Sequence, residues 1–290
     1  MQKFAVLLTC FNRKEKSLAA LESLFKAKQE LSLDIDMSVY LTDDGSTDGT
    51  SEAIQKYYPK VNLLKGNGEL FWAGGMRNSW AEALKNDYDA YLLLNDDTKP
   101  YVNFLEELFK THNYCLTKYG KGGVYVGATL DEETNVMTYG GSVFTNKFKG
   151  RYTKLIPNGE YPQECELGNA NIMLASKNAV DKIGQLSKGY VHGLADFDYT
   201  LKAKKNNVPV LLADNYLGTC TNDHIDKYAK FVNLSFKERL KMLHNPIGFD
   251  FESHLVYMKN HFLYRLPLVY LMGYFKVFFP SIYKNKILRK

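Results

Sequence analysis

The sequence predicts an α/β protein with a Rossmann-like layered fold, followed by a basic, mostly helical C-terminal region. In residues 4–94, short apolar runs alternate with segments of helical periodicity, as in a parallel sheet with crossover helices. The run 90–94 is apolar throughout, which is typical of a strand buried on both faces. The chain has 290 residues, 45% hydrophobic and 24% charged, enough for one large domain or one domain with an appendage.

The expected elements follow from local patterns. Apolar runs bounded by turn residues predict four strands in the first half, at residues 4–8, 38–42, 61–64 and 90–94. Helical spacing predicts helices between them, around residues 18–25, at residues 50–58 and from Met76 onward. The second half is more mixed, with strands expected at 124–128, 172–175 and 208–213, a hairpin or pair of loops around Gly140 and Gly141, and a helix at 196–206.

Composition excludes several classes of protein. The four cysteines form no CxxC pair, which argues against a zinc ribbon, a thioredoxin-like site and a disulfide scaffold. Scattered thiols suit a reducing compartment, so we expect a cytoplasmic protein. The first apolar run is too short for a signal peptide. No uncharged apolar run reaches the length of about 18 residues that a spanning helix needs.

Charge is distributed unevenly along the chain. Residues 227–290 hold 12 Lys or Arg and 3 Asp or Glu, a net +9, whereas the whole chain carries +5 and the remainder therefore −4. The aromatic block 262–281 lies in this basic region, which suits an interfacial segment on an anionic membrane surface. Packing of this block on the core or on a second subunit is an equal alternative. Nucleic acid is not expected, because the aromatics do not alternate with basic residues.

Polar side chains end three of the four early strands. Ligands bind at the carboxyl ends of strands in open α/β sheets. Although turns are rich in Asp and Asn, the recurrence at three strand ends favours a site there. The residues concerned are Asn12, Arg13, Asp43, Asp44, Asp96 and Asp97.

The loops of this site exclude two common nucleotide cradles. The loop after the first strand reads TCFNRKE, without the glycines of a dinucleotide-binding GxGxxG motif, and no GxxxxGK[ST] motif exists. A divalent cation between carboxylates and a diphosphate is the natural substitute, because Mg²⁺ prefers one or two carboxylates plus phosphate oxygens. The adjacent Asp96 and Asp97 would otherwise repel each other.

Four stretches together resemble the family 2 glycosyltransferases of the GT-A fold, especially the bacterial rhamnosyltransferase-like branch that builds surface polysaccharides. These stretches are the strand end 9–13, LTDDGSTDGT at 41–50, FWAGGMRN at 71–78 and LNDDT at 94–98. The resemblance covers residues 1–225. It implies a GT-A nucleotide-diphospho-sugar transferase domain at 1–225 and a basic, aromatic, helical region at 226–290.

The resemblance also implies roles for single residues. Asp43 would accept hydrogen bonds from a pyrimidine base, and Arg77, at a helix start, would contact the base or phosphate. Asp97 would ligate a divalent metal, Mn or Mg, with His224 as a further ligand. The donor-binding residues would be Thr9, Phe11, Asn12, Arg13, Asp43, Asp44, Gly75, Arg77, Asn95 and Asp96.

On the acceptor side, Ala195-Asp196-Phe197-Asp198 resembles the family's Glu-Asp-x-Asp segment. Asp196 would then be the general base that deprotonates the acceptor hydroxyl. Asn169 and His192 would line the acceptor site.

The implied activity is inverting transfer of a sugar from a UDP- or dTDP-sugar in a single displacement. The acceptor would be a hydroxyl of a growing glycan or of a lipid-linked saccharide, at the inner face of the plasma membrane. A sugar nucleotidyltransferase is an alternative, although it would need a glycine-rich loop in place of TCFNR. A non-catalytic subunit that binds nucleotide-sugar or glycan also stays open, because Asn95 and Ala195 replace the family's usual acidic residues.

Overall fold

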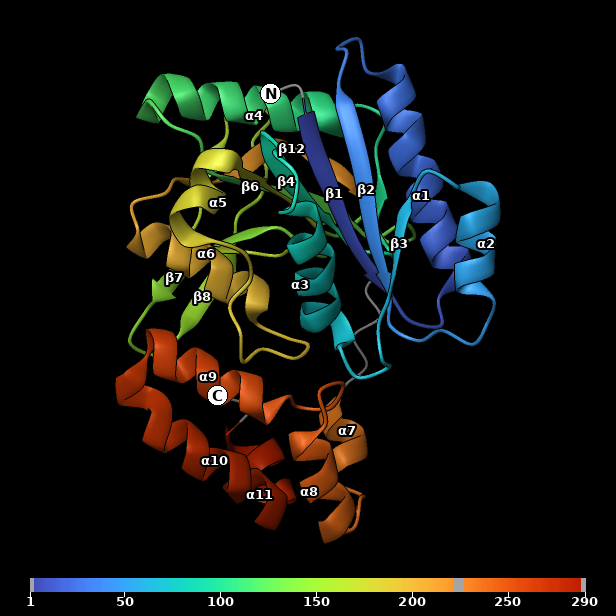
Figure 1. The fold of residues 1–290 in the computed structure, drawn as a ribbon. Coiled ribbons are helices and arrows are strands. Elements are labelled where there is room, and N and C mark those ends of the chain that lie inside the picture. The colour runs from blue at the N-terminus through green and yellow to red at the C-terminus, as the bar shows by residue number, and fades with distance from the viewer. Residues whose placement is uncertain (1–2, 222–226, 288–290) are drawn as a thin grey trace.

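The computed structural model describes residues 3–221 and 227–287, and it has an α/β body with a group of helices at one end (Figure 1). The strands are β1 Lys3–Cys10, β2 Asp36–Asp43, β3 Asn62–Lys65, β4 Ala90–Leu94, β5 Lys99–Pro100, β6 Val124–Leu130, β7 Gly141–Asn146, β8 Arg151–Lys154, β9 Gln163–Glu164, β10 Leu167–Gly168, β11 Ile172–Ser176 and β12 Val210–Thr219. The helices of the body are α1 Lys14–Glu30, α2 Thr50–Tyr57, α3 Phe71–Ala83, α4 Phe104–Tyr119, α5 Lys177–Ile183 and α6 Ala195–Lys205.

One large mixed sheet forms the body. Its strand order is β3-β2-β1-β4-β11-β6-β12-β5, with β9 paired to β12. The first four strands in this order are parallel, as the sequence predicts, whereas β11 runs antiparallel to both β4 and β6. A small second sheet holds β10, β7 and β8. The predicted α/β class is therefore confirmed, with a mixed sheet in its second half.

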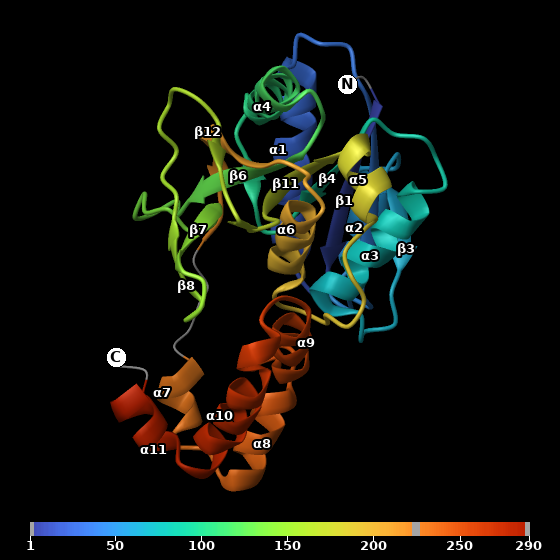
Figure 2. The same ribbon diagram turned by 90° about the vertical axis from the view of Figure 1, so that its left-hand side faces the viewer.

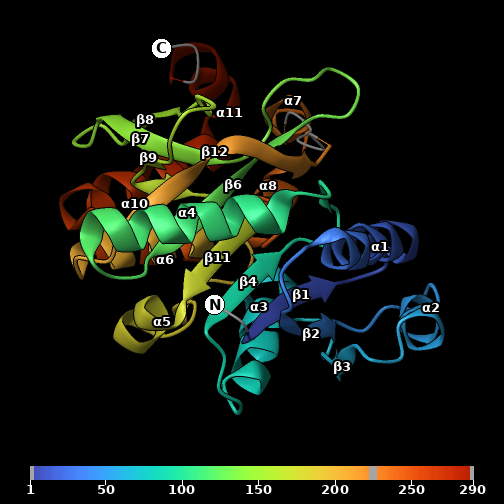
Figure 3. The ribbon, with the colours of Figure 1, turned by 90° about the horizontal axis from the view of Figure 1, so that it is seen from above.

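Helices cover both faces of the large sheet. Alternate residues of β1 face opposite sides: Phe4, Val6 and Leu8 pack with α1 and α4, while Ala5 and Leu7 pack with α3. Figure 3 shows α3 and α5 on one side of the sheet and α1 on the other. A strand covered on both faces must be apolar on both, which explains the uninterrupted apolar runs 4–8 in β1 and 90–94 in β4.

The structure corrects two details of the local structure expected from the sequence. Helix α3 begins at Phe71 and not near Met76, because the Asp44 carboxylate accepts a hydrogen bond from the Phe71 backbone N–H at 2.8 Å and so holds the helix start. The hairpin turn does not lie at Gly140–Gly141. It lies between β7 and β8, at residues 147–150.

The C-terminal helices form a separate layer below α6 and β8 (Figure 2). They are α7 Lys227–Phe231, α8 Phe236–His244, α9 Phe251–His261, a 3-10 turn at Leu263–Arg265, α10 Leu266–Phe278, α11 Pro280–Ile282 and a π-helical turn at Tyr283–Ile287. Their small core contains Phe231, Leu243, Phe251 and Val277. Over the described ranges, no helix is long and apolar enough to cross a membrane.

This helical layer lies at the end of the body toward which β1 and β2 point (Figure 1). It therefore stands beside the carboxyl ends of the parallel strands, where the sequence predicts the site. The predicted boundary between residues 225 and 226 falls outside the described residues.

Candidate active site

A cavity of about 160 Å³ opens at the carboxyl ends of β1, β2 and β4. Trp72 of α3 and Ile247, which lies between α8 and α9, contribute to its wall. Six residues predicted for the site also line it, namely Thr9, Phe11, Arg13, Asp44, Asp96 and His192. The strand ends therefore share one hollow, as the recurrence of polar residues predicted.

Arg13 connects the two aspartates after β4. Its Nη1 donates to Asp97 Oδ2 at 2.7 Å and to Asp96 Oδ1 at 3.2 Å. Burial raises the pKa of Asp96 to about 7, although the nearby Arg13 guanidinium opposes the shift. Two adjacent carboxylates thus converge on one cationic nitrogen, and the adjacent-charge repulsion expected from the sequence is relieved by an arginine of the same chain.

The two carboxylates suit a divalent cation whose remaining ligands come from phosphate oxygens. Within the described ranges, no three His, Cys, Asp or Glu side chains gather as a metal cluster. Mg²⁺ needs only one or two protein carboxylates when phosphate oxygens complete its coordination shell. Asp97 and Asp96 together supply that number of carboxylate ligands. Asp97 also accepts a hydrogen bond from the Cys220 thiol at 3.6 Å, at the end of β12. His224, the predicted further ligand, lies outside the described residues.

The residues at the end of β2 order their own loops. The buried Asp43 accepts hydrogen bonds from Ser46 N at 2.8 Å and from the Ser51 hydroxyl. Asp44 accepts from Gly68 N at 2.9 Å as well as from Phe71 N. Of the two, Asp44 lines the cavity, and contact of Asp43 with a base stays a prediction.

Asn12 also organises a loop at this end of the sheet. Its backbone N–H donates to Ser46 Oγ at 2.8 Å, and its Oδ1 accepts from Thr47 N at 2.7 Å. The residue has a positive φ of 50°, a conformation that asparagine tolerates better than most residues. Asn12 therefore joins the loop after β1 to the DDGSTDGT stretch, and the structure does not place it in the cavity wall.

Asn95 occupies the position where the family motif usually has its first aspartate. Its Oδ1 accepts a hydrogen bond from the Trp72 indole Nε1 at 2.7 Å. The side chain is thereby committed to holding Trp72, which lines the cavity. Direct contact of Asn95 with a donor stays a prediction, and its observed effect is to fix an aromatic part of the wall.

The structure does not bring Arg77 to the cavity. Because α3 begins at Phe71, Arg77 lies beyond its first turn, and its guanidinium donates to the carbonyls of Ser187 at 3.1 Å and Tyr190 at 2.9 Å. The expectation that Arg77 sits at a helix start is therefore wrong. Gly75 also has a packing role, because a Cβ there would lie 2.0 Å from Thr9 Oγ1.

We expect Gly75→Ala to destabilise the protein by about 1–3 kcal/mol, the usual range for overpacking a filled core. Alanine favours helices over glycine by about 1 kcal/mol. A loss of stability in this variant must therefore come from packing. The measurement is urea unfolding followed by circular dichroism. Gly74→Ala is the matched control, because its added Cβ would meet Leu70 Cβ at 3.1 Å, a contact that a small shift relieves. Equal stabilisation by both substitutions would contradict the close approach of α3 to Thr9.

Asp196 and Asn169, predicted for the acceptor side, do lie together. Asp196 Oδ2 accepts from Asn169 Nδ2 at 3.3 Å and from Ala170 N at 3.4 Å, and Oδ1 accepts from Phe197 N at 2.8 Å. Burial raises the pKa of Asp196 above its ordinary value, although these hydrogen bonds oppose the shift. A raised pKa makes the ionised carboxylate a stronger base.

Sequence reasoning missed the contribution of the C-terminal region. Ile247 lines the cavity, and Asp250 accepts hydrogen bonds from the backbone N–H groups of His192 and Gly193. Pro246 and Gly248 mark a loop in the sequence, but nothing in the sequence connects this loop with the sheet edge.

Comparison with known proteins agrees with this geometry. Residues 5–126, less than half of the chain, match the family model described as Glycosyl transferase family 2. No curated protein sequence matches the chain.

Several structures of TarS from S. aureus have a similar fold. The structure of its residues 1–349 aligns with 99% of this chain and 75% of that one, at 14% identity and a TM-score of 0.52. The same fragment in complex with UDP-GlcNAc aligns with 84% of this chain and 65% of that one, at 15% identity and a TM-score of 0.50. The complex of this fragment with UDP aligns with 83% of this chain and 69% of that one, at 17% identity and a TM-score of 0.52.

The chain spans only 42% of a longer TarS structure, and identities this low show the fold alone. The family match covers β1 to β4 and reaches into β6, which includes the strand ends around the cavity. The GT-A-type α/β fold and the resemblance to family 2 glycosyltransferases noted in the sequence are thereby confirmed, with the family match confined to residues 5–126.

Proposed function

We propose that this protein is an inverting glycosyltransferase that moves a sugar from a nucleoside diphosphate, a UDP- or dTDP-sugar, to a hydroxyl of a growing glycan or lipid-linked saccharide in surface polysaccharide synthesis. The observation that carries the proposal is the shared cavity lined by Arg13, Asp44 and Asp96 at the carboxyl ends of three parallel strands. The family of residues 5–126 and the UDP and UDP-GlcNAc complexes of the similar TarS fragment support a nucleotide-sugar as donor.

In this proposal the donor lies along the strand ends. The loop of Thr9, Phe11 and Arg13 borders the nucleotide, and Trp72, fixed by Asn95, offers an aromatic face to a base or sugar ring. The Arg13 guanidinium lies against Asp96 and Asp97, and we propose that it meets phosphate oxygens when a donor enters.

A divalent metal, Mn²⁺ or Mg²⁺, would be held by Asp97 with support from Asp96. When bound, such an ion neutralises charge on the departing diphosphate. The cation would compete with Arg13 for the same carboxylate oxygens, and Arg13 would then be free to turn toward the phosphates.

Asp196 is proposed as the base that accepts the proton of the acceptor hydroxyl. An ionised carboxylate can do so as the hydroxyl oxygen attacks the anomeric carbon and the bond to the diphosphate breaks. Attack from the face opposite the leaving group inverts that carbon in one step. Asn169 donates a hydrogen bond to this carboxylate through its side-chain amide. His192 borders the cavity, and we propose that it contacts the acceptor.

A panel of nucleotide-sugars tests the proposal. The protein is incubated with each donor, Mn²⁺ and a mixture of saccharide acceptors, and released nucleoside diphosphate is measured. Acceptor-dependent release supports the transferase. Donor binding without release under any acceptor would instead favour the non-catalytic binding subunit.

We also propose that the C-terminal helices rest on an anionic membrane surface. The group of exposed apolar side chains on and beside α10 comprises Leu263, Tyr264, Leu268, Tyr270, Leu271, Phe278, Phe279 and Ile282. The region around them carries a net charge of +9. Apolar residues beside basic ones suit binding at a lipid headgroup boundary. Such placement would bring the site close to a lipid-linked acceptor.

Substitution of two exposed leucines of α10 tests whether this surface binds a membrane. Leu268 and Leu271 are 59% and 65% exposed, so their replacement by glutamine should leave the fold intact. We expect Leu268→Gln/Leu271→Gln to lower recovery in flotation with vesicles that contain anionic lipid. The control is Leu33→Gln/Leu116→Gln, at two exposed leucines of the body. Equal flotation of both variants and the wild type would contradict a role for α10.

A further inference from the structure

The segment between α5 and α6, residues 184–194, leads directly into the proposed catalytic machinery. It carries His192 and is followed by the first turn of α6, which carries Asp196. The segment has no helix or strand of its own, so its backbone polar groups need partners from elsewhere in the fold.

Three consecutive backbone N–H groups of this segment are satisfied by α9 and the residue before it. Val191 N donates to Ser253 Oγ at 3.0 Å. His192 N and Gly193 N both donate to Asp250 Oδ2, at 3.2 and 2.8 Å. The C-terminal region thus supplies acceptors to the backbone on both sides of the His192 side chain.

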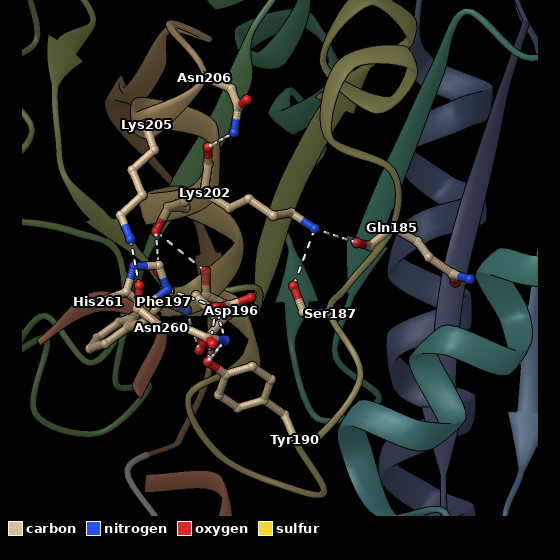
Figure 4. A network of polar contacts seen from close by, with 12 residues as sticks. Gln185, Ser187, Tyr190, Asp196, Phe197, Lys202, Lys205, Asn206, Asn260 and His261 are labelled. Atoms are coloured by element: carbon tan, nitrogen blue, oxygen red, sulfur yellow. Dashed lines mark hydrogen bonds and ion pairs between the residues drawn. The ribbon is translucent and has the colours of Figure 1, made fainter. Parts of the chain in front are cut away.

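Helix α9 also binds the first turn of α6 through a buried network. His261 Nε2 is 2.7 Å from Asp198 Oδ1, and the two side chains are only 4% and 2% exposed. Tyr190 OH donates to the same oxygen at 2.8 Å, and Asn260 Nδ2 lies 3.4 Å from it. Figure 4 shows His261, Asn260 and Tyr190 converging beside Asp196 at the start of α6.

The body holds the other side of the segment. Arg77 of α3 donates to the carbonyls of Ser187 and Tyr190, and Ala73 N donates to the Val191 carbonyl at 3.1 Å. The segment is therefore fixed between α3 and α9. This gives Arg77 an observed structural role in place of the predicted donor contact.

The two aspartates of this turn have opposite environments. Burial raises the pKa of Asp196. Burial would also raise the pKa of Asp198, but hydrogen bonds from His261, Ser187 and Tyr190 outweigh it, and its pKa lies below the ordinary value. Separated acidities of this kind allow one carboxylate to exchange a proton while its neighbour stays ionised.

We propose that α9 positions the catalytic groups: Asp250, Ser253 and His261 hold residues 184–194 and the first turn of α6, and so set where His192 and Asp196 stand. The three are positioning residues, since they act through these neighbours. The inference rests on the proposed role of Asp196.

His261→Phe tests the inference, because phenylalanine keeps a ring and removes the nitrogen that faces Asp198. We expect kcat to fall roughly 10- to 100-fold, the size of effect that a small misplacement of reacting groups causes. The KM for donor should stay within about twofold, because the donor cavity is formed mainly by the strand ends. His261→Gln, which retains an N–H donor of similar reach, should recover much of the loss.

Hydrogen exchange provides a readout that does not need turnover. Backbone amides 191–193 and 198 should exchange faster in His261→Phe than in the wild type. The matched control is His112→Phe on α4, where the histidine contacts the Tyr125 hydroxyl at 2.8 Å. Helix α4 lies at the end of the molecule remote from α9 (Figure 1), so this control should change neither kcat nor exchange of residues 191–198.

An unchanged kcat with unchanged exchange in His261→Phe would overturn the inference, as would equal effects of the two His→Phe variants. If His261→Phe does not fold, Ser253→Ala removes a single hydrogen bond and is judged on the same two readouts. A wild type that binds donor without turnover would overturn the proposed function. The exchange experiment would then decide separately whether α9 holds the segment.

Discussion

Asp196→Asn should lower kcat about 1,000-fold, since a positioned general base contributes about 10²–10⁴-fold. The substitution keeps the size of the side chain and removes its ability to take a proton. Donor binding should be retained, because Asp196 is not among the residues that line the cavity of Arg13 and Asp96. The measurements are acceptor-dependent release of nucleoside diphosphate and calorimetric titration with UDP.

Asp181→Asn is the matched control for this variant. Asp181 belongs to α5, and its side chain is 63% exposed beside Lys177, so the same chemical change there should leave kcat unaltered. In the wild type, the acid limb of the kcat profile should lie above the ordinary pKa of an aspartate, because burial raises the pKa of Asp196 and the base works only when ionised. Full turnover by Asp196→Asn would remove Asp196 as the base.

Asp97→Ala should weaken UDP binding in Mn²⁺ by at least about 10-fold, since even the outer partners of metal ligands cost 10- to 100-fold on removal. Without Mn²⁺ the variant should bind UDP at least as well as the wild type. The reason is that loss of Asp97 removes one of the two carboxylates that hold Arg13, and Arg13 is then freer to meet the phosphates. Calorimetry with and without Mn²⁺ measures this difference without any need for turnover.

Asp87→Ala is the control for that titration. Asp87 lies between α3 and β4 and is 84% exposed beside Lys177, away from the strand ends that form the cavity. Its loss should leave the Mn²⁺ effect intact. An Mn²⁺ effect of equal size in Asp97→Ala and in the wild type would show that Asp97 is not the metal-binding carboxylate.

The sequence predicts the sheet well where a strand is buried on both faces. Strand β4 has the predicted bounds because an apolar run with polar flanks leaves no other choice. The sequence does not reveal the start of α3, because the group that holds it, Asp44, is 27 residues earlier in the chain. Helix α4 is not among the predicted elements, although Phe104, Leu105, Leu108 and Phe109 carry its buried stripe.

The candidate site also has one part that the sequence predicts and one part that it does not. The gathering of acids at the strand ends follows from topology alone and could be predicted. The partners of each acid could not, because they depend on side-chain geometry across distant segments: Arg13 meets Asp97 over 84 residues, and Asn95 meets Trp72 over 23. The hold of α9 on residues 191–193 uses backbone N–H groups, which no sequence motif reveals.

A structure of the protein with a UDP-sugar and Mn²⁺ tests the central claim most directly. The account predicts the diphosphate in the hollow between Arg13 and Asp96, with the metal on Asp97 and the anomeric carbon facing Asp196. A nucleotide bound elsewhere, with the Arg13 to Asp97 contact still intact, would contradict it.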